Sequence, residues 1–348
     1  MTEDISKYWT RGKLGIISCS SGEHFAEKVS SRLEEIIEND NPSKKDENVL
    51  IPMTERQFAN TELKTEIDES IRNKDIYVFQ DVENPSLGLS VNDNYMALKT
   101  AIIAAKSSDA RHITAVVPVF PYARQDKPKT REGISAAMVA RELEDAGATR
   151  VITLDIHQEA TSGFFRKAVL ENLRASKKIM DYTYDNIPMD DLVITSPDAG
   201  GAQRASFYAR ELSRPLAIMH KERDYSTVNS VEKMTLVGDV EGKDCLFVDD
   251  MIDTAGTTVD AIDMVKQYDA NDVYFATSLP LLNGPAKERL QKSYDEGKLT
   301  KVIGTDVTYH DPEFLHETPW YDHVELDKYF AKVIHNLNQG DSISRLLL

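Results

Sequence analysis

The chain has 348 residues, of which 41% are hydrophobic and 28% are charged, and its formal net charge is −17. This length predicts about two domains of a globular protein, and the acidity argues against broad binding to nucleic acids or anionic membranes, which requires a basic surface. Two cysteines, a polar and acidic N-terminal segment and the lack of a long apolar run predict a cytoplasmic protein with free thiols and neither a signal peptide nor a membrane span.

Strand-like and helix-like segments alternate along the chain. The first half predicts strands at 14–18, 75–80, 112–120 and 150–154, and helices at 23–37, 94–107 and 135–146. The second half predicts strands at 192–196, 216–220, 246–248, 272–279 and 301–305, and helices at 202–212, from 259 onward and at 287–294. Strands separated by helices of this length predict an α/β fold with two wound parallel-sheet domains.

The domain boundary is predicted near residues 165–184, after the last strand of the first half. We expect an N-terminal domain of residues 1–170 and a C-terminal domain of residues 171–323. The final helix, within residues 324–348, is expected to pack back on the first domain.

The most distinctive stretch follows the predicted buried strand at 246–248. Three carboxylates, Asp249, Asp250 and Asp253, come within five residues and precede Thr254–Thr257, which opens a helix. The free N–H groups and positive dipole end of a helix start suit a phosphate, whereas carboxylates suit sugar hydroxyls or a divalent cation. The pattern favours a phosphorylated sugar over the alternative, an ordinary polar turn.

Two other strand ends carry polar side chains. Asp155 and His157 lie two residues apart, so on an extended segment they would share a face and could bind a metal or position a phosphate, although a lone histidine is often structural. Asp198 precedes Gly200 and Gly201 in a loop typical of an anion-binding nest, where its carboxylate could hold Mg²⁺. An ordinary turn with a helix cap is the alternative for this loop.

Basic residues are concentrated in two further segments of this acidic chain. Arg124 and Gln125 precede a basic run at 127–131, which favours an anion pocket over a solvated loop. Lys221 and Arg223 lie in a polar loop that could fold over a polyphosphate, although charged loops are usually only hydrated.

Taken together, these motifs resemble those of ribose-phosphate pyrophosphokinases, also called phosphoribosyl pyrophosphate synthetases. The resemblance covers nearly the whole chain and is carried by Tyr122–Asp126, Leu154–His157, Gly163–Phe165, Ser196–Gly201, Lys221–Arg223, Val248–Thr257 and Ser342–Ser344. It implies two domains of phosphoribosyltransferase-like type and a transferase of nucleotide biosynthesis. The implied reaction moves the pyrophosphoryl group of ATP to the C1 hydroxyl of ribose 5-phosphate, giving AMP and 5-phosphoribosyl 1-pyrophosphate.

The resemblance also implies roles for individual residues. Ribose 5-phosphate would be bound by Asp249, Asp250, Asp253, Thr254, Ala255, Gly256, Thr257, Asp198, Gly200 and Gly201. ATP would be bound by Arg124 and Gln125 and, from a neighbouring subunit, by Phe58, Asn60 and Glu62. The Mg²⁺ residues would be Asp155, His157 and Asp198, and the catalytic residues Lys221, Arg223 and His157. Because the ATP site is shared, a homo-oligomer of up to six subunits is expected.

The sequence departs from the family pattern at a few positions. Arg166 and Leu170 stand where acidic residues are common, so the metal role of that segment does not carry over. Glu159 and Ala160 replace Ser-Gln in a segment that binds regulatory phosphate or ADP, and a carboxylate there would repel phosphate. Asn60 stands where Asp is usual, so nucleotide preference could differ.

Two alternatives remain. A catalytically silent regulatory subunit would be expected to lose the catalytic and metal residues, all of which are present. A type I phosphoribosyltransferase needs only the stretch at 248–257 and gives no reason for Tyr122–Asp126 or Lys221–Arg223.

Overall fold

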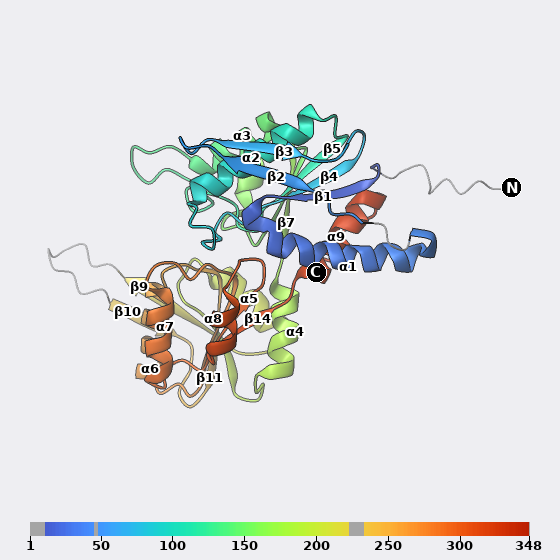
Figure 1. Cartoon of the computed structure of the whole chain (residues 1–348). Coiled ribbons are helices and arrows are strands. Elements are labelled where there is room, and N and C mark those ends of the chain that lie inside the picture. Colours follow the sequence, from blue (N-terminus) through green and yellow to red (C-terminus); the bar gives the residue numbers. More distant parts are fainter. Residues whose placement is uncertain (1–10, 45–47, 223–232, 348) are drawn as a thin grey trace. The chain divides into compact units, whose positions relative to one another are not determined.

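The computed structural model describes residues 11–44, 48–222 and 233–347. The chain divides into two compact units (Figure 1). The first consists of the chain through Arg174 together with Asp306–His310 and the segment from Glu325 onward, and the second consists of Ala175–Thr305 and Asp311–Val324.

The first unit is built on a parallel sheet whose strands follow the order β1-β4-β5-β6-β7. The strands are β1 (Leu14–Ser18), β4 (Asp75–Phe79), β5 (His112–Val116), β6 (Arg150–Leu154) and β7 (Val169–Leu173), and a separate hairpin joins β2 (Met53–Gln57) to β3 (Leu63–Ile67). The long helices are α1 (Glu23–Asp40), α2 (Val91–Ser107), α3 (Ser135–Ala146) and α9 (Asp327–Gln339), and short 3₁₀ turns span Ser20–Gly22, Pro42–Lys44 and Glu159–Phe164. All five residues of β4 are buried, as expected for a parallel strand covered on both faces.

Helices pack in pairs in the first unit. α1 packs with α9 and α2 packs with α3, and the two pairs lie on opposite sides of the sheet (Figure 1). The α1–α9 contact includes edge-to-face packing of Phe25 and Phe330 at 5.1 Å between ring centroids. At the N-terminal edge of the sheet, the Asn338 amide of α9 donates to the carbonyl oxygen of Gly12 and to buried Asp75. The last helix therefore closes the unit that contains the first strand.

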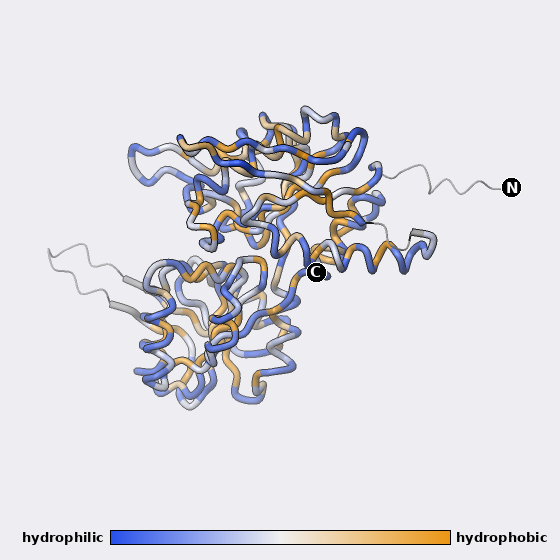
Figure 2. Tube along the Cα trace, in the orientation of Figure 1, coloured by the Kyte–Doolittle hydropathy of each residue, from blue (hydrophilic) through white to orange (hydrophobic). Residues whose placement is uncertain are grey.

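The second unit is built on a seven-stranded sheet of order β10-β9-β8-β11-β12-β13-β14. Its strands are β8 (Leu192–Ser196), β9 (Leu216–Glu222), β10 (Lys233–Val237), β11 (Asp244–Ile252), β12 (Val273–Pro280), β13 (Lys301–Thr305) and β14 (Tyr321–Val324). Its helices are α4 (Ser176–Asn186), α5 (Ala202–Glu211), α6 (Gly256–Gln267), α7 (Ala286–Asp295) and α8 (Pro312–Glu317). In both units the hydrophobic segments gather in the strands (Figure 2).

The predicted α/β class with two parallel-sheet domains is confirmed, with corrections to single elements. β10 is antiparallel to β9 at the sheet edge, and β4 and β5 are shorter than predicted. The helix predicted from residue 94 begins at Val91, because Ser90 and Asp93 form a capping box. Among the described residues, no helix is long and apolar enough to cross a membrane.

Candidate active site

The strand order of the second unit reverses direction between β8 and β11. From β8 the chain winds through α5 to β9 on one side, and it later returns to place β11 on the other side. Ligands of wound sheets bind beyond the carboxyl ends of the strands at such a reversal. The Asp198 loop follows β8 and the Asp249–Thr257 stretch includes the end of β11, so both predicted sugar-phosphate motifs lie at this edge.

Asp249 and Asp250 belong to the end of β11 rather than to the loop predicted after it. The pairing of β11 with β8 ends at Phe247 and Thr195, whereas its pairing with β12 continues to Ile252. The backbone that carries the two carboxylates therefore pairs with β12 on one side and extends beyond the end of β8 on the other.

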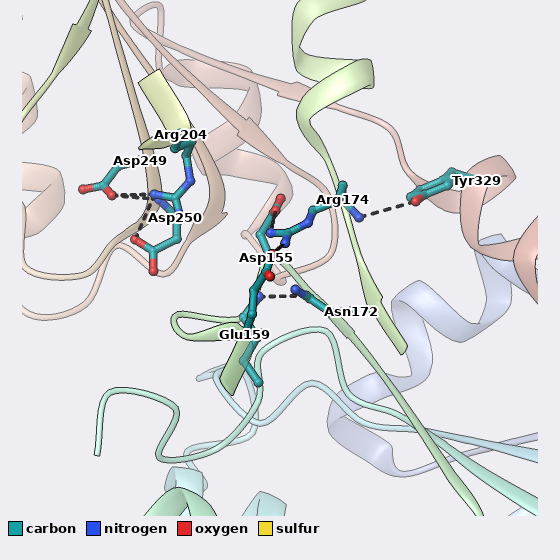
Figure 3. Close-up of polar contacts among 9 residues, drawn as sticks. Asp155, Glu159, Asn172, Arg174, Arg204, Asp249, Asp250 and Tyr329 are labelled. Carbon is teal, nitrogen blue, oxygen red and sulfur yellow. Dashed lines mark hydrogen bonds and ion pairs between the residues drawn. The ribbon is translucent and has the colours of Figure 1, made fainter. Parts of the chain in front are cut away.

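The guanidinium of Arg204 contacts both carboxylates (Figure 3). Its Nη1 lies 3.0 Å from Asp249 Oδ1 and 3.5 Å from Asp250 Oδ1, and Asp249 Oδ1 also accepts the backbone N–H of Asp250 at 2.8 Å. Burial raises the pKa of Asp249 and the Asp250 carboxylate raises it further, while Arg204 opposes both effects. Sequence reasoning missed Arg204, although its position in the first turn of α5 was a signal, because a helix dipole disfavours a cation there.

The predicted phosphate loop begins α6 with Ala255 in the left-handed region, at φ 57°. This conformation is uncommon outside glycine and is often associated with functional loops. Two side chains from outside the loop hold it: Arg289 Nη1 donates to the carbonyl oxygen of Thr254 at 2.8 Å, and the Asn283 amide donates to Asp253 Oδ1 at 3.2 Å. Thr254 and Thr257 are exposed at the start of the helix, where first-turn N–H groups suit an anion.

The Asp198 loop forms a tight turn into α5. Asp198 Oδ1 accepts the N–H of Gly201 at 2.7 Å, and the hydroxyl of Ser196 donates to the carbonyl oxygen of Asp198 at 2.7 Å. A Cβ on residue 201 would lie 2.9 Å from Ser196 Oγ, so the close approach favours glycine there. Asp198 and Gly200 are exposed, so the carboxylate caps the turn and can still meet a ligand.

In the first unit, Asp155 and His157 do not share a face as predicted for an extended segment. β6 ends at Leu154, and Asp155 has φ 39°, so the chain turns sharply after the strand. Asp155 is buried and its Oδ1 lies 3.1 Å from Arg174 Nη1, whereas His157 is exposed. Asn172 Oδ1 accepts the N–H of Ile156 at 2.9 Å, so Arg174 and Asn172 hold two consecutive residues of the turn (Figure 3).

The role of Arg174 was also not predicted from the sequence. Its second guanidinium nitrogen pairs with Glu159, and its backbone N–H donates to the hydroxyl of Tyr329 in α9 at 3.4 Å (Figure 3). One arginine thus connects the turn after β6, the following 3₁₀ turn and the C-terminal helix.

The predicted ATP residues of the first unit are on its surface. Phe58 is 54% exposed beside the β2–β3 turn, where Asn60 Oδ1 accepts the N–H of Glu62 at 3.2 Å. Arg124 and Gln125 are exposed after β5, and Gln125 Oε1 accepts the hydroxyl of Ser135 at 2.7 Å.

Of the two predicted catalytic residues of the second unit, Lys221 belongs to β9, and Arg223 lies outside the described residues.

Comparisons with known proteins match both units. A family model for the N-terminal domain of ribose phosphate pyrophosphokinase matches residues 14–147, and a phosphoribosyl transferase domain model matches residues 167–313. Ribose-phosphate pyrophosphokinase 4 of Saccharomyces cerevisiae is 39% identical over 292 residues, which cover 83% of this chain and 85% of that protein. Ribose-phosphate pyrophosphokinase 2 of Enterococcus faecalis is 36% identical over 344 residues, covering 98% of each chain.

The chain belongs to the ribose-phosphate pyrophosphokinase family. The crystal structure of phosphoribosylpyrophosphate synthetase from Mycobacterium smegmatis matches with a TM-score of 0.81 and 31% identity, covering 94% of this chain and 99% of that one. The family resemblance and the phosphoribosyltransferase-like fold predicted from the sequence are both confirmed.

The segment in which this family member departs at Arg166 is fixed by a carboxylate of its own chain. Glu144 Oε1 of α3 accepts the consecutive N–H groups of Arg166, Lys167 and Ala168 at 2.8, 2.6 and 2.7 Å. Burial acts to raise the pKa of Glu144, but these N–H groups hold it below its usual range. The nest at residues 166–168 therefore binds an internal anion.

Proposed function

We propose that the chain is an active ribose-phosphate pyrophosphokinase. The observation that supports this best is the Asp249–Asp250 pair, which is held by Arg204 beside a helix start with a left-handed Ala255. Family membership supports the acceptor sugar phosphate as the ligand of this loop. The proposed reaction converts ATP and ribose 5-phosphate to AMP and 5-phosphoribosyl 1-pyrophosphate.

The second unit is proposed to bind ribose 5-phosphate. The backbone from Asp253 to Thr257 would hold the 5-phosphate, and Asp249 and Asp250 would accept hydrogen bonds from the ribose hydroxyls. Gly200 and Gly201 would let the backbone approach the ligand closely. This arrangement orients the C1 hydroxyl, which is the nucleophile of the reaction.

The transfer itself requires positioning and charge neutralisation rather than a covalent intermediate on the protein. The C1 hydroxyl releases its proton to solvent as its oxygen forms a bond to the β-phosphorus of ATP. The bond between that phosphorus and the oxygen bridging to the α-phosphate breaks, and AMP leaves with that oxygen. Lys221 and Arg223 are proposed to neutralise the charge that develops on the transferred group. Arg124, Gln125 and His157 are proposed to contact ATP.

The family implies Mg²⁺. The residues fit an ion that protein carboxylates and phosphate oxygens bind together, rather than an ion enclosed by protein ligands alone. Among the described residues, no three His, Cys, Asp or Glu side chains are grouped to hold a metal ion. Mg²⁺ at nucleotide sites commonly uses one or two carboxylates together with phosphate oxygens, so exposed Asp198 suits it. His157 would assist, and Asp155, which pairs with Arg174, would support the turn. When bound, the ion would supply positive charge to the ATP phosphates.

The assembly is part of the proposal. Exposed Phe58, with Asn60 and Glu62, is proposed to contact ATP bound to a neighbouring subunit, so the active form is a homo-oligomer. A nucleotide-biosynthetic enzyme of this kind would act in the cytoplasm.

The deciding experiment follows nucleotide products. Purified protein incubated with Mg²⁺, ATP and ribose 5-phosphate is expected to produce AMP and 5-phosphoribosyl 1-pyrophosphate in equal amounts. ADP as the product would refute pyrophosphoryl transfer, and a folded, oligomeric protein without turnover would support a silent regulatory subunit.

One variant tests the catalytic role proposed for Lys221. Lys221→Ala is expected to lower kcat by about 10²-fold or more, because a donor that acts on transition-state charge is lost. Lys243→Ala is the control, because Lys243 is a surface lysine of the same unit paired with Asp191. An unchanged kcat in Lys221→Ala would remove Lys221 from the proposed role.

A further inference from the structure

The shared contact of Arg204 with Asp249 and Asp250 points to a role in sugar recognition. We propose that Arg204 is a positioning residue that holds the two carboxylates as a matched pair of acceptors for two neighbouring hydroxyls of ribose. This inference rests on the proposed function and deepens it, because it concerns which sugar phosphate the loop selects.

Strand geometry alone does not bring these carboxylates together. Neighbouring side chains of a strand point to opposite faces, yet Asp249 Oδ1 and Asp250 Oδ1 both lie within 3.5 Å of Arg204 Nη1. Asp249 is turned back toward its own backbone, where Oδ1 also accepts the N–H of Asp250. The guanidinium is thus a common partner that offsets the repulsion between two adjacent carboxylates.

The place of Arg204 in α5 supports a specific role. It is the third residue of the helix, where the positive end of the helix dipole opposes a cation. The two carboxylates of β11 explain why a guanidinium is stable there. The Asp249 side chain keeps 26% exposure and can be reached by a ligand, whereas Asp250 keeps only 7% and is held in place by its surroundings.

A purely structural ion pair would behave differently from a positioning residue. Loss of a structural pair lowers the melting temperature and weakens every ligand of the loop to the same extent. Loss of a positioning residue weakens most the ligand that uses both carboxylates. Ribose 5-phosphate offers neighbouring hydroxyls at C2 and C3, and 2-deoxyribose 5-phosphate keeps only the C3 hydroxyl of these two. Comparing the two sugars therefore separates a structural role from a positioning role.

The test compares Arg204→Met and Arg204→Lys with Arg210→Met in the full-length protein. Arg210 is on the same helix and contacts Glu211. Its side chain is 71% exposed, so it is a matched surface control. Binding of each sugar phosphate is measured calorimetrically without ATP, together with KM for ribose 5-phosphate and for ATP. Melting temperatures report on the fold.

We expect Arg204→Met to bind ribose 5-phosphate about 10- to 100-fold more weakly than the wild type. Its affinity for 2-deoxyribose 5-phosphate should change much less, and its KM for ATP should be unchanged. Arg204→Lys should recover part of the preference, and Arg210→Met should match the wild type. Equal weakening of both sugars, or unchanged binding in a folded Arg204→Met or Arg204→Lys, would overturn the inference and leave the proposed function in place. A wild-type protein that does not bind ribose 5-phosphate would overturn both.

Discussion

Each unit of this protein places an arginine against carboxylates at the end of a parallel strand, but the two clusters differ in what the arginine holds (Figure 3). After β6, Arg174 pairs with a buried carboxylate, Asp155, and the exposed residue of the turn is His157. At the end of β11, Arg204 contacts Asp249 and Asp250, the carboxylates that are proposed to meet the substrate. One arginine fixes a backbone turn, and the other fixes ligand-binding groups.

Strand order explains this difference. The strands of the first unit follow one another across the sheet in chain order, so this sheet continues in one direction from β1 to β7. The second unit reverses direction between β8 and β11, which leaves a place for ligands beyond these two strand ends. Similar chemistry therefore serves as scaffold in one unit and as a candidate binding site in the other.

The largest expected effect comes from removing the charges of the second cluster. Replacing Asp249 and Asp250 together by Asn keeps their size, but it removes both negative charges and replaces one acceptor oxygen of each residue by an amide donor. Since a hydrogen bond to a charged group contributes about 1.5–3 kcal/mol, kcat/KM for ribose 5-phosphate should fall by about 10²-fold or more. Asp191→Asn, on a carboxylate that is 63% exposed, is the control. A double variant with wild-type kcat/KM would show that this cluster is scaffold too.

A smaller effect is expected from the first cluster, and it should fall mainly on stability. Arg174→Met leaves buried Asp155 without its guanidinium partner and should lower the free energy of unfolding by about 1–3 kcal/mol, less than for a fully buried pair because Arg174 is 31% exposed. The melting temperature measures this loss, and Arg174→Lys should recover part of it. An unchanged melting temperature with a lost kcat would show instead that Arg174 acts in catalysis.

The sequence allowed most strands of the two main sheets and the main loop to be predicted, because both signals are local. The run Leu246–Val248 indicates a buried strand, and Asp253–Thr257 indicates a helix start that suits phosphate. The partners of the carboxylates were not predictable, because Arg174 is 19 residues from Asp155 and Arg204 is 45 residues from Asp249. Which arginine reaches which carboxylate depends on strand order, and strand order is not visible in local periodicity.

Other misses have different physical causes. The β2 strand, Met53–Gln57, carries too many polar side chains to show a buried pattern, because its hairpin is separate from the main sheet. The shared face expected for Asp155 and His157 was wrong because the chain leaves the extended conformation directly after Leu154. The roles of Phe58, Arg124 and Lys221 stay predictions, since they depend on ligands rather than on the fold of one chain.

The pH dependence of sugar binding offers a third comparison of the clusters. Burial and the Asp250 carboxylate raise the pKa of Asp249 to about 8. The acid is protonated below this pKa and becomes a full acceptor above it, so affinity for ribose 5-phosphate should increase as pH rises from about 7 to about 9, by less than tenfold per pH unit. Calorimetric titrations at constant ionic strength measure this, and Asp249→Asn should remove the slope. A flat profile in the wild type would show that Arg204 keeps the pair ionised throughout.

The smallest effect is expected at Glu159, the second partner of Arg174. Its side chain is 76% exposed, and solvent screens such a pair, so Glu159→Gln should change the free energy of unfolding by about 0.5 kcal/mol or less. The melting temperature should then stay close to that of the wild type and well above that of Arg174→Met. If Glu159→Gln were as damaging as Arg174→Met, the exposed carboxylate would be the main anchor of the arginine. The turn after β6 would then depend on a surface ion pair, and the contrast between a buried scaffold in one unit and a ligand-facing cluster in the other would fail.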